Sequence, residues 1–436
     1  MTNRIDENRP KLREARVWTA ELESQTRPDG STLIWQRGEL GDYPDRLTDS
    51  IDQWAEATPD RVWMAQRDKG GDWRRITYGQ MREQVRAIGQ WLLDLGLSQD
   101  RPLMILSGNS LEHALMALGA QYVGIPSAAI SPAYALVSSD YGKQRSIAEQ
   151  ITPGAVFVQE TAPFAPAIDA VLPADVPVIA VTGALDRRRS VSFAEVVATR
   201  PADAVDAARR AIGPDTVAKF LFTSGTTGSP KAVTQTNRML CSNMVMVRDC
   251  FAFMQDEPPV VCDWAPWNHT ASGNKVFNMV LFNGGTYYID EGKPTPSGIR
   301  ETIRNLREIS PTWYFNVPAG YEALAHAMHD DKALRDSFFR DLRMLMYAGA
   351  GMARHTWEEL ERYAVQAVGE RVRIVTGLGA TETAPFALQC VEPQDLPGNI
   401  GIPAKGVTIK LVPVEDKLEV RIRGRTSPRA TGAPPT

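Results

Sequence analysis

Two kinds of hydrophobic pattern alternate along the chain from about Leu47 onward. In one kind, apolar residues recur at helical spacing; in the other, short apolar runs bounded by glycine and proline have the length of buried strands. The predicted helices are Tyr78–Leu95 and Ser110–Tyr122, and the predicted strands are Leu103–Ser107, Ala155–Val158 and Pro177–Val181. Strands that alternate with helices of this length are typical of an α/β protein with largely parallel sheets.

A second alternating block extends from Val260 to Val375, and the pattern changes after Gly398. The second block predicts helices at Arg300–Ile309 and Arg354–Val368 and strands at Thr312–Asn316 and Met344–Tyr347. The segments Val407–Pro413 and Lys417–Arg423 alternate with period 2 and have no helix between them, which predicts paired β-strands. We therefore expect one large domain over residues 1–424, with two parallel-sheet α/β subdomains and a small β-subdomain at about 398–424.

The stretch Ala114–Ser139 contains no charged residue and must be considered as a membrane span. It contains Pro126 and Pro132, and Glu112 and Asp140 flank it. Prolines and turn residues at these positions favour a buried strand-and-turn segment over a membrane helix. The N-terminal residues are polar and lack the apolar core of a secretory signal. We expect a soluble, cytoplasmic protein with no membrane span.

The charge and the cysteines narrow the classes of function. With 48 Lys and Arg against 52 Asp and Glu, the formal net charge is −4, whereas nucleic-acid-binding proteins usually have a clear basic excess. The four cysteines, Cys241, Cys250, Cys262 and Cys390, form no CxxC pair and have no histidine at metal-ligand spacing. We expect buried thiols in a reducing compartment and no nucleic-acid partner.

The segment Phe220–Lys231 carries the strongest chemical signal. An apolar strand runs into a loop of glycines and hydroxyl residues, which Pro230 and Lys231 follow. Glycines let backbone N–H groups approach an anion, hydroxyls add donors, and a lysine adds positive charge, so the loop suits a polyphosphate. The spacing of a P-loop is absent, and Ala232–Thr236 predicts a second strand before a helix that begins near Asn237. By itself, such a loop is also compatible with a flexible surface hairpin.

The string SGTTGSPK at Ser224–Lys231 resembles the signature loop of the adenylate-forming superfamily, which includes acyl-CoA synthetases, luciferases and peptide-synthetase adenylation domains. The resemblance implies a loop that holds the phosphates of ATP. The residues implied to form the ATP-binding loop are Thr223, Ser224, Gly225, Thr226, Thr227 and Gly228, and Lys231 is implied to support it.

Two further segments resemble motifs that follow in the same order in this superfamily. Tyr347–Gly351 follows a predicted strand, and the resemblance places Gly349, Ala350 and Gly351 against the adenine. In isolation, this segment is equally compatible with a plain strand-to-helix turn. Gly398–Pro403 resembles the turn that enters the β-subdomain, and its implied role is structural.

The segment Thr376–Thr383 resembles the superfamily motif in which an aromatic residue and a glycine precede Thr-Glu. The resemblance implies that Thr381 holds the α-phosphate region and that Glu382 binds Mg²⁺, a hard cation suited to carboxylate oxygen. Leu378 stands where the family usually has Tyr or Trp, so the adenine would meet an aliphatic side chain. The remaining residues implied in this part of the ATP site are Gly379 and Ala380. Taken alone, Glu382 could be a solvated loop carboxylate.

The segment Trp264–Gly273 resembles the superfamily's Pro-x-x-His element, which lies beside the carboxylate substrate. The residues implied in substrate binding are Trp267, Asn268, His269 and Gly349. Together with Asn283–Asp290, the segment is similar to feruloyl-CoA synthetase and its relatives. Flat apolar walls with one or two polar groups suit a planar aryl-propenoic acid such as ferulate better than a long alkyl chain. Medium-chain acids and other aryl acids remain open.

The resemblance implies an AMP-forming acid–thiol ligase that uses ATP, Mg²⁺ and CoA. A carboxylate oxygen attacks the α-phosphate, pyrophosphate leaves, and the thiol of CoA takes the acyl group from the acyl-adenylate. Catalysis would then consist mainly of positioning and charge neutralisation at phosphorus, with Thr223, Lys231, Thr381 and Glu382 as the catalytic residues. The expected partners are a small carboxylic acid, ATP and CoA, and a homodimer is compatible with the sequence.

The family's C-terminal domain, which bears a catalytic lysine, is not recognisable in the sequence. Residues 425–436 are rich in Arg, Thr, Ala and Pro and predict a disordered tail. Back-translation with GC-rich codons and one restored cytosine yields a segment similar to the family's continuation. Our hypothesis is a single-base deletion that shifts the frame from about Arg425. We expect an intact ATP site but adenylation near background.

Two other functions are compatible with the same motifs. An adenylation domain that loads a carrier protein usually has an aspartate for the ammonium of an amino acid, and Asp263 beside tryptophans is a poor candidate for that role. A non-catalytic nucleotide-binding protein is the second alternative.

Overall fold

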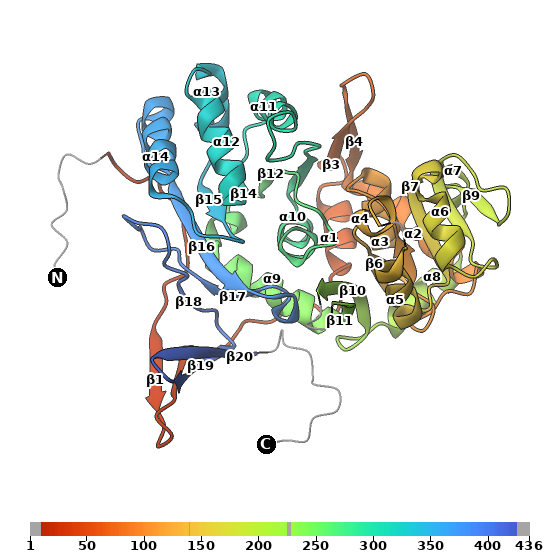
Figure 1. Ribbon diagram of the computed structural model, residues 1–436, viewed down its shortest axis with the longest axis horizontal. Helices are drawn as coiled ribbons and strands as arrows, with labels where there is room; N and C mark the ends of the chain where they lie inside the picture. The colour runs from red at the N-terminus through yellow and green to blue at the C-terminus, as the bar shows by residue number, and fades with distance from the viewer. Residues whose placement is uncertain (1–9, 139, 225–227, 425–436) are drawn as a thin grey trace.

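A computed structural model describes residues 10–138, 140–224 and 228–424 of the chain. Within these ranges the strands form four sheets. Figure 1 shows three of them one after another across the molecule and the fourth, with red and dark blue strands, at the lower left, while helices α9 and α10 lie near the centre. These two central helices are α9 (Asn237–Cys250) and α10 (Phe277–Phe282). The mixed α/β fold with parallel sheets that the sequence predicts is confirmed.

A seven-stranded sheet forms one half of the molecule. Its order is β11-β10-β6-β5-β7-β8-β9, and every pair is parallel except β10 with β11. Its strands are β5 (Leu103–Ile105), β6 (Ser127–Ala129), β7 (Ala155–Glu160), β8 (Val178–Thr182), β9 (Ser190–Ser192), β10 (Val217–Ser224) and β11 (Pro230–Thr236). Leu103 and Ile105 join one apolar cluster whereas Met104 joins another, so both faces of the sheet are buried.

Helices cover both faces of this sheet, as Figure 1 shows. They are α2 (Tyr78–Asp94), α3 (Leu111–Tyr122), α4 (Ala133–Leu136), α5 (Gly142–Ile151), α6 (Thr161–Val171), α7 (Phe193–Val197) and α8 (Asp203–Ala211). The two predicted helices begin at side-chain caps. The hydroxyl of Thr77 accepts the N–H of Gln80 at 3.3 Å, and that of Ser110 accepts the N–H of His113 at 3.0 Å.

Two further sheets continue one another across the middle of the molecule. The first has the order β12-β13-β3-β4 and the second β14-β15-β16-β17-β18. The N–H of Thr312 donates to the carbonyl of Val260 at 2.9 Å and so links the edges of the two sheets. The strands are β3 (Val62–Arg67), β4 (Trp73–Thr77), β12 (Val260–Asp263), β13 (Thr286–Ile289), β14 (Trp313–Asn316), β15 (Met344–Tyr347), β16 (Arg373–Gly379), β17 (Phe386–Gln389) and β18 (Ile402–Pro403).

The remaining α-helices of the described chain are α1 (Asp49–Ala57), α11 (Ile299–Glu308), α12 (Pro318–Met328), α13 (Lys332–Arg340) and α14 (Arg354–Val368). The predicted helices Arg300–Ile309 and Arg354–Val368 correspond to α11 and α14, whereas the other three were not predicted. The two predicted blocks are nevertheless not separate sheets. Strands β3 and β4 come from the first block but pair beside β13, because parallel neighbours need not be consecutive in sequence.

The small sheet combines both ends of the described chain. Its order is β1-β2-β19-β20, with β1 (Leu22–Thr26), β2 (Thr32–Gln36), β19 (Val407–Val414) and β20 (Lys417–Gly424). The two predicted C-terminal strands are confirmed, and the sheet also contains β1 and β2, which lie outside the predicted range of about 398–424. The hairpin β1–β2 was missed because most of its residues are exposed or half-buried, which leaves little alternation to detect.

The uncharged stretch after Glu112 is almost entirely buried over residues 114–130, whereas residues 131–138 are mostly half-buried or exposed, and the stretch is not simply a strand and a turn. It contains most of α3, then β6 and α4. Among the described helices, none combines the length and the apolar character needed to cross a bilayer. The four cysteines are buried free thiols, which confirms that part of the prediction.

Arg209 on α8, one of the helices that cover the seven-stranded sheet, forms ion pairs with α1. Its guanidinium lies 2.8 Å from the Asp49 carboxylate and 2.5 Å from that of Asp52, and it stacks 4.0 Å above the ring of Tyr122. The Arg209 side chain is only 11% exposed. Removing one partner of a buried ion pair leaves the other charges without compensation.

We therefore expect Arg209→Met to lower the free energy of unfolding by about 2 kcal/mol, because Asp52 loses its cation and Asp49 keeps only its ion pair with Arg46. Urea titration followed by far-UV circular dichroism measures the loss. Arg210→Met, on the exposed side of the same helix, is the matched control. Equal destabilisation by the two variants would contradict this role.

Candidate active site

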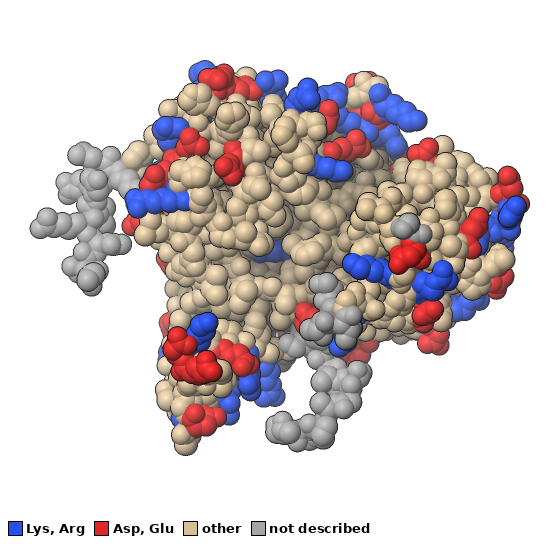
Figure 2. All heavy atoms as spheres, in the orientation of Figure 1, with Lys and Arg blue, Asp and Glu red and all other residues tan. Residues whose placement is uncertain are grey.

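A cavity of about 410 Å³ opens where the sheet of β14–β18 approaches α10. The space-filling view shows a recess at the centre of this face, among side chains that mostly carry no charge (Figure 2). The residues that line the cavity are Trp264, Ala265, Pro266, His269, Thr270, Ala271, Lys275, Phe315, Val317, Met346, Ala348, Gly349, Gly377, Leu378, Gly379, Pro385, Phe386, Leu388 and Gln389.

One wall of the cavity is the carboxyl edge of three strands. Phe315 lies near the end of β14 and Met346 near the end of β15, and Gly377–Gly379 ends β16. The carboxyl ends of parallel strands lie at one edge of a sheet, where α/β proteins usually bind ligands. The wall lies at this edge because its residues stand at the carboxyl ends of short buried strands, which the sequence pattern predicts.

The opposite wall is the segment Trp264–Thr270 together with a six-residue π-helix, η2 (Ala271–Val276), that leads into α10. The segment packs directly against the π-helix at Gly273. A Cβ atom on Gly273 would lie 2.0 Å from the carbonyl oxygen of Trp267, so only glycine fits there. Wide helical turns of this kind are frequent at functional sites.

Trp267 and Asn268 are not among the described residues that line the cavity, although the sequence implied both in substrate binding. Trp267 is buried, and its indole N–H donates to the Tyr287 hydroxyl at 2.9 Å. The Tyr287 hydroxyl in turn donates to the Asp263 carboxylate at 2.8 Å. Trp264 is the tryptophan of this segment that faces the cavity, and the substrate roles of Trp267 and Asn268 stay predictions.

His269 lies at the cavity wall, and a hydrogen bond indicates its tautomer. The N–H of Ala271 donates to Nδ1 of His269 at 3.2 Å, so Nδ1 carries no proton. Burial of part of the ring lowers the pKa of His269 below its ordinary value of 6.5. At neutral pH the imidazole is therefore uncharged, with Nε2–H as its one donor.

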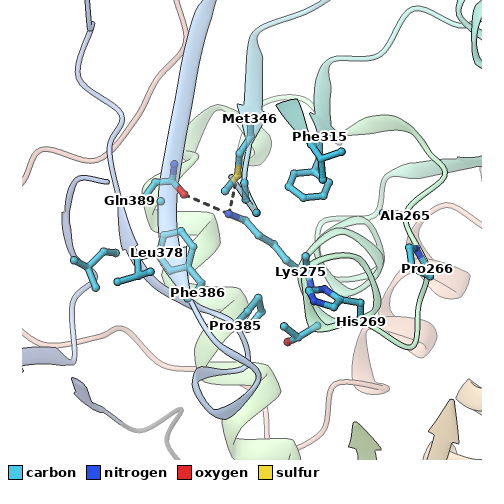
Figure 3. Close-up of a pocket in the computed structure, with 18 of the residues that line it drawn as sticks. Ala265, Pro266, His269, Lys275, Phe315, Met346, Leu378, Pro385, Phe386 and Gln389 are labelled. Atoms are coloured by element: carbon cyan, nitrogen blue, oxygen red, sulfur yellow. Dashed lines mark hydrogen bonds between the residues drawn. The ribbon is translucent and has the colours of Figure 1, made fainter. Parts of the chain in front are cut away.

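Lys275 is a buried cation in the same cavity. Its side chain extends from η2 towards Met346 and Gln389 (Figure 3), with Nζ 2.9 Å from the Met346 sulfur and 3.3 Å from Oε1 of Gln389. The rings of Phe386 and Phe251 lie 4.9 and 5.3 Å from Nζ. Burial lowers the pKa of Lys275 from 10.5 to about 7, because no carboxylate of the described chain pairs with it.

Lys275 was not among the predicted site residues, although the sequence contains a signal for it. Lys275 is the one Lys, Arg, Asp or Glu between Asp263 and Asp290. An isolated charge in an apolar segment either reaches solvent or has a special role, because burial of a charge without a partner is costly. Phe315, Met346, Phe386 and Gln389 carry no comparable signal, since buried strand residues of these types are ordinary.

The implied phosphate loop joins two antiparallel strands, as the sequence predicts. Thr223 on β10 lies opposite Lys231 on β11 in the ladder. The Thr223 side chain is half-buried, Lys231 is exposed, and Gly228 has a left-handed backbone with φ +84°. Gly225, Thr226 and Thr227 lie outside the described residues, and the phosphate contacts of the whole loop stay a prediction.

The Thr-Glu segment forms a short 3₁₀ turn, η3 (Thr381–Thr383). Two of its backbone carbonyls accept hydrogen bonds from buried side-chain amides. Nε2 of Gln235 on β11 donates to the carbonyl of Thr381 at 3.0 Å, and Oε1 of Gln235 accepts Nδ2 of Asn274 at 3.1 Å. Nδ2 of Asn243 on α9 donates to the carbonyl of Thr383 at 3.1 Å. One amide thus links the strand after the phosphate loop, the Thr-Glu turn and the π-helix of the cavity.

Glu382 fits the role of a ligand for a metal that arrives with a nucleotide. Its carboxylate is exposed and has no hydrogen-bond or ion-pair partner in the described ranges. Groups of three or more His, Cys, Asp or Glu that could hold a metal ion are also absent there. Mg²⁺ is commonly bound by one or two carboxylates plus substrate phosphates, so a single free carboxylate is compatible with it.

The two glycine segments lie at the mouth of the cavity. Gly349, Leu378 and Gly379 line it, and Ala350 and Gly351 are exposed just beyond β15. Leu378 is 37% exposed, so its side chain offers an apolar surface to a ligand at the entrance. A Cβ on Gly379 would lie 1.8 Å from the carbonyl oxygen of Pro385, which accounts for glycine at this position.

A comparison with protein families shows which family the chain belongs to. The family described as AMP-binding enzyme matches residues 51–426, which is most of the sequence. The chain belongs to the AMP-binding enzyme family. The resemblance to adenylate-forming enzymes is thereby confirmed.

Curated relatives of this AMP-binding enzyme include ligases for aromatic acids. A 3-hydroxybenzoate–CoA ligase of Aromatoleum sp. (strain CIB) is 25% identical over 78% of this chain and 61% of the relative. A 4-coumarate–CoA ligase of Solanum tuberosum is 24% identical over 79% of this chain and 60% of the relative. The chain thus spans about three fifths of these relatives' length. A feruloyl-CoA synthase of Amycolatopsis sp is 28% identical over 49% of this chain and 42% of the relative.

Solved structures show the same fold for this AMP-binding enzyme. A benzoate CoA ligase from Burkholderia xenovorans LB400 superposes with a TM-score of 0.69 at 18% identity, covering 88% of this chain and 72% of that one. An anthranilate CoA ligase in complex with anthranoyl-AMP also gives a TM-score of 0.69, at 17% identity, covering 89% and 70%.

The amide of Gln235 generates a first prediction for the site. We expect Gln235→Leu to lower the free energy of unfolding by about 2 kcal/mol, because the Thr381 carbonyl and the Asn274 amide both lose a buried partner. Urea unfolding measures this loss. Gln366→Leu, at an exposed glutamine of α14, is the control, because it removes an amide without leaving a buried polar group unpaired. A Gln235→Leu variant as stable as the wild type would contradict the link.

The buried Lys275 generates a second prediction, on pH. The unfolded chain takes up the lysine proton below about pH 10.5 but the folded chain only below about pH 7, so the stability of the wild type rises with pH between these values. We expect Lys275→Met to be more stable than the wild type, by most at pH 7 and by less at pH 9.5. Urea unfolding at both pH values measures the difference.

The exposed Lys332→Met on α13 serves as the control for this prediction, because its lysine is in water in both states. A stability difference between Lys275→Met and the wild type that does not change with pH would show that Lys275 keeps an ordinary pKa.

Proposed function

We propose that this chain is the nucleotide-binding part of an AMP-forming carboxylate–CoA ligase that activates an aryl-propenoic acid such as ferulate. The observation that carries the proposal is the cavity itself, which runs from Gly349 and Leu378 at its mouth to Phe315, Met346 and Phe386 at its apolar end. A ligand that fills it has one end beside the Thr-Glu turn, where a carboxylate would meet ATP.

The residues of the chain have separate roles in this proposal. Thr223 and the loop after it hold the phosphates, and Lys231 supports the loop from the facing strand. Thr381, whose backbone Gln235 holds, lies at the α-phosphate, and Glu382 binds the magnesium ion. The ion supplies positive charge to the phosphate oxygens when ATP is bound. Neutral His269, with its Nε2–H donor, lies beside the acyl group and orients it.

The proposed reaction transfers AMP and then the acyl group. A carboxylate oxygen of the acid forms a bond to the α-phosphorus as the bond to pyrophosphate breaks. The thiol sulfur of CoA then forms a bond to the acyl carbon as the bond from that carbon to the oxygen of AMP breaks, and the thiol proton is released to solvent. The described residues contribute to catalysis mainly by binding the acid and ATP in the aligned positions that the reaction needs and by stabilising charge at phosphorus.

The shape and chemistry of the cavity support an aromatic acid. Its walls combine Phe315 and Phe386 with glycines at Gly349, Gly377 and Gly379, a combination that leaves space for a flat group. The relatives named for 3-hydroxybenzoate, 4-coumarate and ferulate have the same substrate class in their names. The proposal includes a cytoplasmic protein, a homodimer and dependence of full turnover on a lysine-bearing C-terminal domain.

An amino-acid-activating domain that loads a carrier protein is a weaker candidate. Among the described residues that line the cavity there is no Asp or Glu to pair with an ammonium group. Asp263 lies behind the wall, where Ser272 and Tyr287 donate to its carboxylate at 2.5 and 2.8 Å. Burial raises the pKa of Asp263 to about 6, and a carboxylate so occupied does not face a ligand.

Titration calorimetry with acyl-sulfamoyl-adenosines, stable mimics of the acyl-adenylate, tests the proposal. We expect the feruloyl mimic to bind at least about tenfold more tightly than sulfamoyl-adenosine without an acyl group, because the cavity buries the ring. A phenylalanyl mimic should gain nothing, since its ammonium has no partner. Equal affinity for all three compounds would refute the aryl-acid ligase.

Glu382→Gln tests the magnesium site separately. We expect it to weaken binding of Mg·ATP about tenfold, because a neutral amide is a poorer ligand for a hard cation. Binding of the feruloyl mimic, which needs no metal, should change by less than about twofold and so controls for folding. Unchanged affinity for Mg·ATP would remove Glu382 from the site.

A further inference from the structure

The apolar end of the cavity contains a polar pair that the proposed chemistry at phosphorus does not use. Nζ of Lys275 and Oε1 of Gln389 lie 3.3 Å apart, and both residues line the cavity. Lys275 is 4% exposed and Gln389 1%. Buried polar groups in an apolar pocket are costly unless a ligand or a neighbour satisfies them, so such a pair is typical of a specificity site.

The orientation of the Gln389 amide is fixed. Its Nε2 donates to the carbonyl of Thr376 at 2.8 Å and to that of Cys390 at 3.2 Å. Exchanging the amide oxygen and nitrogen would place two acceptors against these carbonyls, so Oε1 must face Lys275. The oxygen has two lone pairs, and in the described chain only Lys275 uses one of them.

The ammonium of Lys275 also has one donor left. Of its three N–H groups, one is directed at the Met346 sulfur and one at Gln389, and the described residues offer no third acceptor. The two free positions are therefore one donor on Lys275 and one acceptor on Gln389. In Figure 3 the amine of Lys275 and the side chain of Gln389 lie on the side of the Lys275 stem away from His269.

A hydroxyl group satisfies both free positions, and a carboxylate does not. A hydroxyl oxygen accepts from Lys275 while its hydrogen donates to Gln389. A carboxylate has no hydrogen, so one of its oxygens would lie against the lone pairs of Gln389 and the sulfur of Met346. The flanking rings of Phe251 and Phe386 also favour a neutral aromatic group over a second full charge.

We propose that Lys275 and Gln389 bind a phenolic hydroxyl at the ring end of the substrate, so that the site selects hydroxylated aryl acids. This inference rests on the proposed ligase function and adds to it a specificity determinant. The hydroxyl accepts one hydrogen bond from Nζ and donates one to Oε1, and no covalent bond changes. Because a phenol is neutral, its binding adds no charge to the cavity.

The low pKa of Lys275 supports this assignment. Burial without a carboxylate partner lowers the pKa of Lys275 to about 7, and a hydroxyl oxygen that accepts from Nζ stabilises the ammonium form that donates to it. An unhydroxylated acid leaves both Lys275 and Gln389 without these partners, and sites with unpaired polar groups reject such analogues strongly.

The test compares acyl-sulfamoyl-adenosines that differ only in the ring substituent, using calorimetry on the full chain. The four acyl groups are cinnamoyl, 3-hydroxycinnamoyl, 4-coumaroyl and 4-carboxycinnamoyl. We expect at least one hydroxylated mimic to bind about tenfold or more tightly than the cinnamoyl mimic. We expect Lys275→Met to reduce this ratio to about one, while Lys332→Met keeps the wild-type ratio.

The outcomes separate this inference from the proposed function. If both hydroxylated mimics bind no better than the cinnamoyl mimic, but all exceed sulfamoyl-adenosine alone, the ligase proposal stands and the hydroxyl site is wrong. Tightest binding of the 4-carboxycinnamoyl mimic would replace the hydroxyl by a second carboxylate and overturn the proposal. If the preference persists in Lys275→Met, the lysine is not its source. Since these comparisons begin with the wild type, poor folding of a variant leaves a decisive result.

Discussion

The geometry of the candidate site depends on buried side-chain amides whose orientation is fixed by their hydrogen-bond partners. Gln235 joins the strand after the phosphate loop to the Thr381 turn and to Asn274 on the π-helix, and Asn243 holds the same turn from α9. A buried amide has strongly directional partners, and a misplaced one loses two hydrogen bonds at once. The elements that would carry ATP and the elements that would carry the acid are therefore held in one geometry, although they come from distant parts of the sequence.

Much of the fold follows from the sequence pattern alone. Helices such as α2 and α14 and strands such as β15 were predicted to within a residue or two, because each buries a continuous apolar face. The pairing of β3 with β13 could not be predicted, since periodicity says what a strand buries but not beside which neighbour. The hairpin β1–β2 was missed for a related reason: it is stabilised by pairing with β19 more than by burial of its own side chains.

The candidate site shows the same division between local and non-local information. Motifs fixed by backbone needs, such as Gly379 against Pro385, are visible as short strings. Lys275 and Gln389 belong to no string, and only the fold brings a residue of η2 to the end of β17. Trp267, a conspicuous aromatic beside a motif, is buried among core side chains, and the sequence alone gives no sign of that burial. In this cavity the costly group is the lysine, and a buried amine kept without a carboxylate indicates selection for something other than stability.

The small sheet built from β1, β2, β19 and β20 has a consequence for biosynthesis. On the ribosome, the hairpin at Leu22–Gln36 emerges first, but its partner at Val407–Val414 emerges only when almost all of the described chain has been made. The two early strands therefore wait, with an open edge, while the larger sheets assemble behind them. Closure of this sheet is then a late event that joins both ends of the nascent protein, and chaperone protection of the waiting hairpin would matter most during that interval.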